Sequence, residues 1–372
     1  MSAAVSCAAV PATPPASAAA PAAQLPKAPP GTTSWTPWPS ALHDARHSGA
    51  STTEGPANGN LRWRRKLEGG VTPGPVVGAD GTIYVASNGG VLHALNPANG
   101  TDRWTYDSGR TAGGDDLSTS PLVLPSGVVL FAAGSRITML SPTGKPLWSK
   151  EFDGRVTSPV TADGERVYLG TSSGTVTALD VAAPDRTRVA WRTDAGAVSY
   201  ASVVTDGHGR VYTTADSALV AIDDRGDFAA VAWRSDPHDD ITEVSPGLAA
   251  DGTALLGTNG RDEWAYRPDG TVRWQAPRII TYSSPAVTAT GLSYVADHGG
   301  RVHVFDIRTG SETASYGPVG TNDLLPVSAA FALDAGRAAH APVGALGARP
   351  GRGERNGVMP DWRRATGATG SS

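Results

Sequence analysis

Six tryptophans recur along the chain at a nearly constant interval. They stand 41 to 44 residues apart, at Trp63, Trp104, Trp148, Trp191, Trp233 and Trp274. A fixed period of roughly 20 to 50 residues is typical of repeat proteins, in which each repeat is one supersecondary unit that packs against its neighbours. The period therefore predicts an array of similar units in this part of the chain, rather than several unrelated domains.

The segments between the tryptophans share a common order of short motifs. A Ser-Pro or Thr-Pro pair opens most units, and an Asp-Gly turn follows in four of them. A β-rich run comes next: IYVAS (83–87), VLFAA (129–133), VYLGT (167–171), VYTTA (211–215) and ALLGT (254–258). After another turn comes an alternating run: VLHAL (91–95), ITMLS (137–141), TVTALD (175–180), LVAID (219–223) and VHVFD (302–306). Each unit is therefore predicted to form four short strands.

Four-stranded units of this length predict the blades of a β-propeller. A single blade cannot bury both of its faces, so consecutive blades stack around an axis. The 45 glycines and 29 prolines among 372 residues supply many turns and argue against a helix bundle. The fold class is thus all-β, a β-propeller of four-stranded blades. We expect the six tryptophans to be structural and to pack between neighbouring blades rather than to contact a ligand.

Composition excludes several classes of protein. Charged residues make up 18% of the chain and the formal net charge is −4, which argues against a nucleic-acid binder. No apolar stretch is long enough to predict a transmembrane segment. The single cysteine, Cys7, excludes a disulfide framework and a zinc site built from cysteines.

Two further motifs point to a known family. Residues 94–104 read ALNPANGTDRW and residues 306–314 read DIRTGSETA. Both resemble the end of the PQQ-like (pyrroloquinoline-quinone-type) repeat, Ala-x-Asp-x-x-Thr-Gly-x-x-x-Trp, with Ala314 in place of the tryptophan. The segment WTPWPSALHDARHSGAS (35–51) also resembles a lead-in common in secreted bacterial members of that family. The resemblance extends over about 280 residues and implies the propeller fold.

The resemblance implies two functional classes, because one fold serves several activities. One class comprises quinone-dependent dehydrogenases, which hold PQQ and a calcium ion over the propeller axis and use a catalytic aspartate. The other comprises non-catalytic scaffolds, such as the outer-membrane assembly lipoprotein. The enzymes are usually much longer, and many carry a disulfide between adjacent cysteines, which Cys7 alone cannot form. We therefore expect a non-catalytic scaffold with no cofactor; a PQQ- and calcium-dependent dehydrogenase or another propeller enzyme is the alternative.

The number of blades depends on the end of the chain. Six units close between Thr72 and Ala314, and residues 61–67 are predicted to be an outer strand that completes the last blade. The inner strands of that blade then fall in 320–350, where Ala, Gly, Arg and Pro dominate. We expect seven blades with a degenerate last one; eight blades, or a truncated or frameshifted end, are the alternatives. The propeller domain is thus predicted to span residues 35–350, with a disordered tail at 351–372.

The N-terminal 34 residues indicate export. They contain one charged residue, Lys27, and consist mostly of Ala, Pro, Ser and Thr. This composition predicts a disordered leader or the remnant of a signal peptide, with small-residue cleavage sites near 16–18. A start assigned too late would explain the missing basic and apolar parts, and Cys7 could then carry a lipid. We expect an extracytoplasmic location, and a disordered cytoplasmic extension is the alternative.

His43 and His47 are spaced four residues apart with Asp44 between them. On a helix, this spacing can bind a metal ion. Pro37, Pro39 and Gly49 flank the segment, however, and the resemblance implies that it is a structural clasp. The sequence does not decide whether the protein binds a metal ion.

A ligand-binding face is predicted from loop lengths. Loops between blades share a face of the ring with the loops that join second and third strands, and the longest are 107–118 and 235–244. The candidate binding residues on this face are Asp115, Asp116, Tyr200, Asp239, Asp240, Glu243, Tyr282 and Asp297. Acidic and aromatic groups of this kind suit a divalent cation, a sugar or a basic segment of a protein; solvated loop residues without a function are the alternative. We expect a monomer that binds a protein or carbohydrate through this face.

Overall fold

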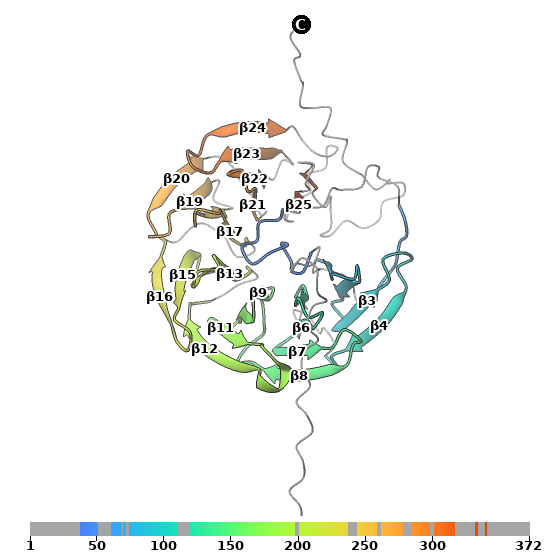
Figure 1. The fold of residues 1–372 in the computed structure, drawn as a ribbon. Helices are drawn as coiled ribbons and strands as arrows, with labels where there is room; N and C mark the ends of the chain where they lie inside the picture. The colour runs from blue at the N-terminus through green and yellow to red at the C-terminus, as the bar shows by residue number, and fades with distance from the viewer. Residues whose placement is uncertain are drawn as a thin grey trace, which may run out of the picture.

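The computed structural model describes residues 38–50, 61–68, 70–71, 74–110, 119–197, 201–236, 244–258, 262–277, 284–297, 301–316, 332–333 and 339–340. Within these ranges, six four-stranded antiparallel sheets follow one another around a ring (Figure 1). One turn of 3-10 helix, η1 (Pro184–Arg186), is the exception to the β structure of this part of the chain. The predicted all-β propeller is confirmed. No helix in the described ranges is long and apolar enough to cross a bilayer.

The sheets are called blades 1 to 6 in chain order, and each is numbered from the innermost strand outward. Blade 1 consists of β1 (Val76–Val77), β2 (Ile83–Ala86), β3 (Val91–Leu95) and β4 (Asp102–Asp107). Blade 2 consists of β5 (Leu122–Val123), β6 (Val129–Ala133), β7 (Arg136–Leu140) and β8 (Pro146–Glu151). Blade 3 consists of β9 (Thr161–Asp163), β10 (Arg166–Gly170), β11 (Thr175–Asp180) and β12 (Arg188–Asp194).

The second half of the ring repeats this arrangement. Blade 4 consists of β13 (Val204–Thr205), β14 (Arg210–Ala215), β15 (Ala218–Asp224) and β16 (Ala229–Arg234). Blade 5 consists of β17 (Gly247–Leu248), β18 (Ala254–Gly257), β19 (Asp262–Tyr266) and β20 (Val272–Pro277). Blade 6 consists of β21 (Ala286–Val287), β22 (Leu292–Ala296), β23 (Val302–Asp306) and β24 (Glu312–Tyr316).

The predicted seventh blade falls mostly outside the described residues. Of the segment 320–350, the structure describes one antiparallel pair, β25 (Ala332–Leu333) and β26 (Ala339–His340). Residues 61–67, predicted to be the outer strand of that blade, form no strand. A strand needs a hydrogen-bonded partner, and the expected partners fall in 320–350. The predicted leader (1–34) and tail (351–372) also lie outside the described residues.

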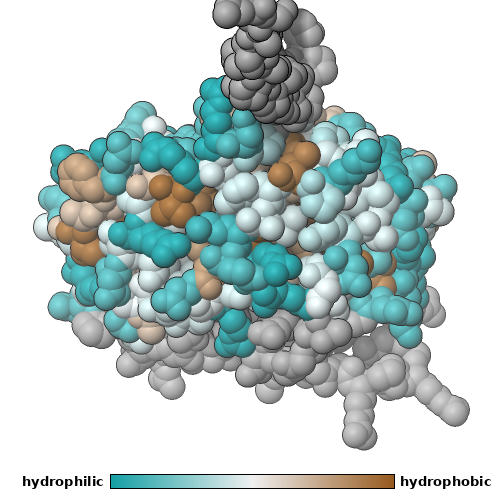
Figure 2. Space-filling view, turned by 90° about the horizontal axis from the view of Figure 1, so that it is seen from below, coloured by the Kyte–Doolittle hydropathy of each residue, from teal (hydrophilic) through white to brown (hydrophobic). Residues whose placement is uncertain are grey.

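Burial explains why the strands differ in sequence from the axis to the rim. β6 is buried along its whole length because neighbouring blades cover both of its faces, and it consists of apolar residues. The outer strands β4 and β8 alternate between exposed and half-buried residues. Figure 2 shows mainly hydrophilic side chains on one side of the molecule, with separate apolar spots. The core therefore consists of apolar clusters between successive blades.

Four of the six tryptophans lie against a glycine turn of the next blade. Trp104, on β4, packs on Gly144 of blade 2, and its indole Nε1 donates to the carbonyl of Pro142 at 2.9 Å. Trp63, Trp233 and Trp274 repeat this contact with Gly100, Gly270 and Gly310. Trp148 and Trp191 instead pack against the apolar clusters between blades 2 and 3 and between blades 3 and 4. In each of these four contacts the indole packs directly on the glycine backbone, so the turn has no room for a side chain.

Gly144→Ala should therefore destabilise the protein more than Gly291→Ala. The two glycines have almost the same left-handed backbone, with φ of 81° and 83°. An added Cβ at Gly144 would lie 2.6 Å from the Trp104 ring, whereas at Gly291 nothing lies within 4 Å. Both variants place alanine in left-handed backbone, which costs about 1–2 kcal/mol. Gly144→Ala adds about 2 kcal/mol of steric strain against the indole. Urea unfolding measures the difference; equal losses would contradict the stacking role of the turn.

A short N-terminal segment lies at the centre of the ring. We call residues 38–50 the hub; it is drawn in blue inside the ring in Figure 1. Its backbone bonds to five innermost strands: Trp38 to Val77, Pro39 to Val123, Ala45 to Thr205, Arg46 to Leu248 and Ser48 to Val287, at 2.7–3.2 Å. The sixth blade, blade 3, is reached through the side chain of His47. The hub therefore links all six blades to one another.

Candidate functional site

Of the eight loop-face residues predicted from the sequence, the structure describes Asp297. The other seven, namely Asp115, Asp116, Tyr200, Asp239, Asp240, Glu243 and Tyr282, lie outside the described residues. Asp297 follows β22, as expected for that face. Its Oδ1 accepts the Arg301 N–H at 2.7 Å, and its Oδ2 lies 3.3 Å from Nε2 of His303. Both carboxylate oxygens thus have contacts within blade 6 itself, and the binding role of this face stays a prediction.

The polar side chains of the hub make hydrogen bonds within the hub that stabilise its turns. Asp44 Oδ1 accepts the backbone N–H groups of Arg46 and Ser48, each at 3.0 Å, and Oδ2 accepts the Ser48 hydroxyl at 2.6 Å. Burial opposes ionisation of Asp44, but the hydrogen bonds from His43 and Ser48 outweigh it and keep its pKa below the ordinary value. Arg46 donates to the carbonyl of Asp206 in blade 4 at 3.0 Å.

The two histidines of the hub do not form a pair on one helix face. His43 and His47 both have left-handed backbone, with φ of 79° and 55°, so the segment is a series of turns. His47 is fully buried, and its Nε2 lies 3.2 Å from the hydroxyl of Thr161 in blade 3. Burial lowers the pKa of His47 to about 4, so the ring is neutral at neutral pH. Among the described residues, no three His, Cys, Asp or Glu side chains are grouped to hold a metal ion.

The residues of the hub show whether a quinone and a calcium ion could bind at this end of the axis. The acidic and basic side chains of the hub itself, other than its histidines, are Asp44 and Arg46, and both are already engaged in hydrogen bonds. The innermost strands present mainly backbone groups to the hub. Calcium requires six to eight oxygen ligands. The described residues at this end of the axis do not supply such a set, so they do not fit the cofactor pair.

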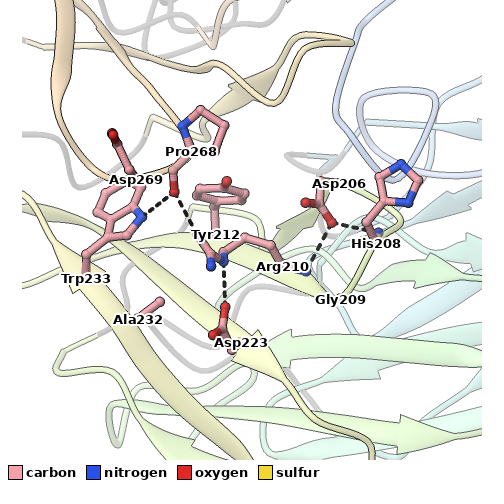
Figure 3. Close-up of a pocket in the computed structure, with 10 residues that line it drawn as sticks. All are labelled: Asp206, His208, Gly209, Arg210, Tyr212, Asp223, Ala232, Trp233, Pro268 and Asp269. Carbon is pink, nitrogen blue, oxygen red and sulfur yellow. Dashed lines mark hydrogen bonds and ion pairs between the residues drawn. The ribbon is translucent and has the colours of Figure 1, made fainter.

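A cleft of about 690 Å³ opens between blades 4 and 5 (Figure 3). The cleft is widely open to solvent, unlike the enclosed pockets that bury most of a small ligand. One wall is the turn before β14, the start of β14 and the strand β16. The other wall is the turn between β19 and β20. Polar and aromatic residues dominate the lining: Asp206, His208, Arg210, Tyr212, Trp233 and Asp269.

Arg210 connects the two walls of the cleft. Its Nε donates to Asp223 Oδ1 at 2.6 Å, and its Nη1 donates to the carbonyl of Pro268 in blade 5 at 2.7 Å. The same carbonyl accepts Nε1 of Trp233 at 2.9 Å. Asp223 also accepts a hydrogen bond from Arg225 at 2.8 Å. Burial disfavours its charge, but the two arginines outweigh that effect and lower its pKa.

Two other carboxylates of the cleft keep one oxygen available. Asp206 Oδ1 accepts the N–H groups of His208 and Arg210, at 2.7 and 3.0 Å. Asp269 Oδ1 accepts the N–H and hydroxyl of Thr271, at 2.9 and 2.7 Å. The Oδ2 atoms of both make no hydrogen bond to any described residue. The cleft thus offers a guanidinium and two carboxylate oxygens on its rim.

Tyr212 forms the floor of this cleft. Its side chain is 1% exposed, and its hydroxyl makes no hydrogen bond of regular geometry within the described residues. Burial raises the pKa of Tyr212, and the Arg210 guanidinium beside it opposes the rise. Its ring meets that of Trp233 edge to face at a centroid distance of 5.9 Å. The Arg210 side chain is therefore the polar neighbour of this buried hydroxyl.

Glu263 is a buried polar group without a hydrogen-bond partner among the described residues. It is fully buried on β19, and neither carboxylate oxygen bonds to a described residue. Burial raises its pKa to about 8, which leaves it mostly protonated at neutral pH. Its ladder partner Ala276 packs with Val295 and Phe305 of blade 6, so Glu263 faces an apolar blade interface.

The repeat itself singles out Glu263. The residues at the same position in the third strands of the other blades are aliphatic and buried: Leu92, Ile137, Val176, Leu219 and Val302. The sequence-based prediction overlooked both Glu263 and the cleft. A blade-by-blade alignment would have marked Glu263 as a departure. The cleft has a weaker signal, since it requires knowing which residues of adjacent blades face each other.

Comparison with known proteins agrees with the architecture. The sequence profile of a family described as outer membrane protein assembly factor BamB matches residues 53–182, 115–278 and 180–330. Together these matches cover more than half of the chain.

Individual relatives come from both functional classes. Protein Rv3035 of Mycobacterium tuberculosis is 27% identical over 291 residues, covering 68% of this chain and 69% of that protein. The assembly factor BamB of Yersinia pestis is 23% identical over 267 residues, covering 67% of this chain and 64% of its own length. The chain thus spans about two thirds of these relatives. A quinohemoprotein alcohol dehydrogenase of Comamonas testosteroni is 33% identical over 120 residues, covering 30% and 17% of the two chains.

Two solved structures share the fold at low sequence identity. BamB from Moraxella catarrhalis superposes with a TM-score of 0.57 at 19% identity, covering 73% of this chain and 80% of that structure. A europium-containing methanol dehydrogenase superposes with a TM-score of 0.55 at 13% identity, covering 72% and 71%. A scaffold and an enzyme are therefore about equally similar in fold, and the fold does not distinguish between the two functions.

Proposed function

This chain belongs to the PQQ-like repeat family of the outer membrane protein assembly factor BamB, and on that premise we propose that it is a non-catalytic, exported propeller that binds a protein partner at the cell envelope. The relatives named as outer membrane assembly factors support the envelope role. The Ala- and Pro-rich residues 1–34 support export. Its binding surface is the loop face that carries Asp297 and the acidic residues predicted from the sequence.

The hub is the observation that carries this proposal. It bonds to the second residue of five innermost strands, which is the end of the ring where the first and second strands of each blade connect. Antiparallel order puts the connections between second and third strands, including Asp297, at the opposite end. One end of the axis is therefore closed by the chain itself. The other end remains for a partner, and loops on a rigid scaffold are a common binding surface.

Site-specific photo-crosslinking in intact cells tests the proposal. A photoreactive residue at Asp297 probes the loop face, and one at Thr290, in the β21–β22 turn of the same blade, probes the hub face. We expect a discrete crosslinked protein from position 297 and none from position 290, because the two turns lie at opposite ends of blade 6. Equal products from both positions, or none from position 297 and its neighbours on that face, would contradict the proposal.

The alternative is a quinone-dependent dehydrogenase, favoured by the alcohol dehydrogenase relative. Such an enzyme oxidises an alcohol and passes electrons to an artificial dye when PQQ and calcium are supplied. We expect no dye reduction above that of heat-denatured protein. Alcohol-dependent dye reduction that requires both PQQ and calcium would replace the scaffold role with catalysis.

A further inference from the structure

We propose that β16, the outermost strand of blade 4, pairs edge to edge with the same strand of a second copy of this chain and so forms a weak two-fold dimer. The strand lies on the outer rim of the ring, and no strand of the described residues pairs with its outer side (Figure 1). This inference goes beyond the proposed function and does not depend on it. It replaces the monomer expected from the sequence with a weak dimer.

β16 lacks the residues that protect the other outer strands. The edge of a sheet presents unpaired N–H and C=O groups, and proteins discourage further pairing there with charged residues or proline. The other five outer strands have such residues at exposed positions, in chain order Arg103, Pro146, Arg192, Pro277 and Glu312. β16 instead has Ala230, Val231 and Ala232 at consecutive exposed positions, and Phe228 just before the strand is 63% exposed. The edge of blade 4 is therefore open to a further strand.

The hydrogen bonds of blade 4 show which backbone groups of β16 face outward. The Arg225 N–H donates to the Phe228 carbonyl at 2.9 Å, so Phe228 turns its backbone groups toward β15. Successive residues of an antiparallel strand alternate between the two sides, so Ala229 and Val231 turn theirs outward. The Ala229 carbonyl accepts a bond from Thr193 Oγ1 of blade 3 at 3.3 Å, and a carbonyl oxygen can accept a second one.

A two-fold axis beside Ala230 pairs these outward groups with those of the second copy. Ala229 of each copy then lies opposite Val231 of the other, and each such pair exchanges two N–H···O=C bonds. The two Ala230 residues form the close pair between them, in which the Cα atoms are about 4.5 Å apart. Alanine suits that position because its side chain is small.

The residues on either side of this centre are complementary to their own copies. Ala232 is the extra residue of a β-bulge, because the register of β15 and β16 shifts there. This extra residue moves the pairing by one position, so Phe228 lies beside Trp233 of the second copy and Asp227 lies beside Arg234. The dimer therefore has an aromatic pair and a pair of opposite charges on each side of the axis.

Charge favours this register over its two neighbours. The same outward groups can also pair when the axis moves by one residue along the strand. One move places Asp227 opposite Val231 of the second copy, and the other places it opposite Asp236, which has a like charge. The side chains of Asp227 and Arg234 are 81% and 37% exposed, so both can reach the second copy. Asp227 also contacts Arg188 of its own copy at 3.1 Å, and an exposed carboxylate can accept from both arginines.

Sedimentation equilibrium of the full chain tests the proposal. A single pair of short strands is a smaller contact than the roughly 1,200–2,000 Å² of a stable interface, so the dimer should be weak. We expect a monomer–dimer equilibrium with a Kd of about 10–500 µM, measured between about 5 µM and 1 mM protein. A chain that remains monomeric at about 1 mM would overturn the proposal and leave this edge to a strand of another protein.

A pair of lysine variants tests whether β16 is the contact. Val231→Lys places a charge at the centre of the edge, and Leu147→Lys places one on β8, the outer strand of blade 2. The two residues are 41% and 37% exposed, so neither variant should lower Tm appreciably. We expect Val231→Lys to raise the Kd of the dimer at least about tenfold and Leu147→Lys to leave it unchanged. Equal dimerisation by Val231→Lys and wild type would overturn the assignment.

A charge exchange tests the register. Asp227→Arg and Arg234→Asp each bring like charges together, so each alone should raise the Kd about three- to tenfold. An equimolar mixture of the two restores both opposite-charge pairs and should dimerise within about twofold of wild type. Folded variants that fail to dimerise when mixed would refute this register. Because Arg234 also donates to the Ala195 carbonyl at 2.7 Å, Tm is measured for each variant, and Val231→Lys keeps the test decisive if Arg234→Asp is unstable.

Discussion

Replacing Glu263 should stabilise the protein, and the gain should grow with pH. The folded-state pKa of about 8 exceeds the ordinary value of 4.5. Because the folded state holds this proton more tightly than the unfolded state, the free energy of unfolding has its full value below pH 4.5. It falls by about 1.4 kcal/mol per pH unit as the pH rises from 4.5 to 8. Glu263→Leu introduces the residue type found at this position in blades 1 and 4, and it should raise the free energy of unfolding by several kcal/mol at pH 8.

Glu263→Gln is the control that separates ionisation from polarity. Glutamine keeps an unpartnered polar group in the blade interface but cannot ionise. We therefore expect urea unfolding of Glu263→Gln to show no loss of stability between pH 6.5 and 8, in contrast to wild type. Parallel curves for wild type and Glu263→Gln over that range would mean that Glu263 does not titrate in the folded protein.

His47 should lower the free energy of unfolding as the pH falls below 6.5. Its folded-state pKa of about 4 lies below the ordinary value of 6.5, so its contribution is present above pH 6.5 and is lost as the pH falls through 4. In wild type, this loss is opposed by the gain from Glu263 over the shared window. With Glu263→Gln the opposing effect is absent, and stability should fall visibly on acidification from pH 6.5.

Asp44→Ala should be the most damaging single change in the hub. It removes the hydrogen bonds from the N–H groups of Arg46 and Ser48 and from the Ser48 hydroxyl, as well as the interaction with His43. The expected loss is about 2–4 kcal/mol, because the backbone donors are left partly buried and unpaired. The hub loses the turn from which Ala45, Arg46, His47 and Ser48 reach blades 3 to 6.

Ser48→Ala is the matched control for Asp44→Ala. It removes the hydroxyl bond to Asp44 and keeps both backbone bonds, so we expect a loss of about 0.5–1.5 kcal/mol. Because the hub bonds to all six described blades, each variant should still unfold in one transition by circular dichroism and by tryptophan fluorescence. Equal losses in the two variants would show that Asp44 does not organise the hub turn.

Much of the fold could be predicted from the sequence because propeller blades are local structures. The runs 83–87, 129–133, 167–171 and 211–215 correspond to β2, β6, β10 and β14 within one or two residues. Each strand pairs with the next one along the chain, so turn residues and alternation define the sheets. The segment 61–67 was the exception, because its expected partners are distant in sequence.

The candidate sites were much less predictable. Asp297 was included because its turn between second and third strands lies on the predicted loop face, and its carboxylate contacts Arg301 and His303 of the same blade. The remaining loop-face residues stay a prediction, as do the cofactor and metal status. Tyr212 does not stand out by residue type, since buried tyrosines recur in several blades, whereas Glu263 departs from the aliphatic residues at its position in the other blades. Their importance depends on which partner the adjacent blade provides.

The sequence by itself thus determined the repeating unit, the four-stranded blades and the ring, because a 41- to 44-residue period and alternating polarity act over short distances along the chain. Only the tertiary structure decided the rest. Residues 38–50 meet strands as distant as Val287 at the axis, Tyr212 and Pro268 of adjacent blades line one cleft, and Glu263 is buried at the interface with blade 6. The physical reason is that a hydrogen bond or a burial penalty depends on neighbours in space, and the closure of the ring selects those neighbours.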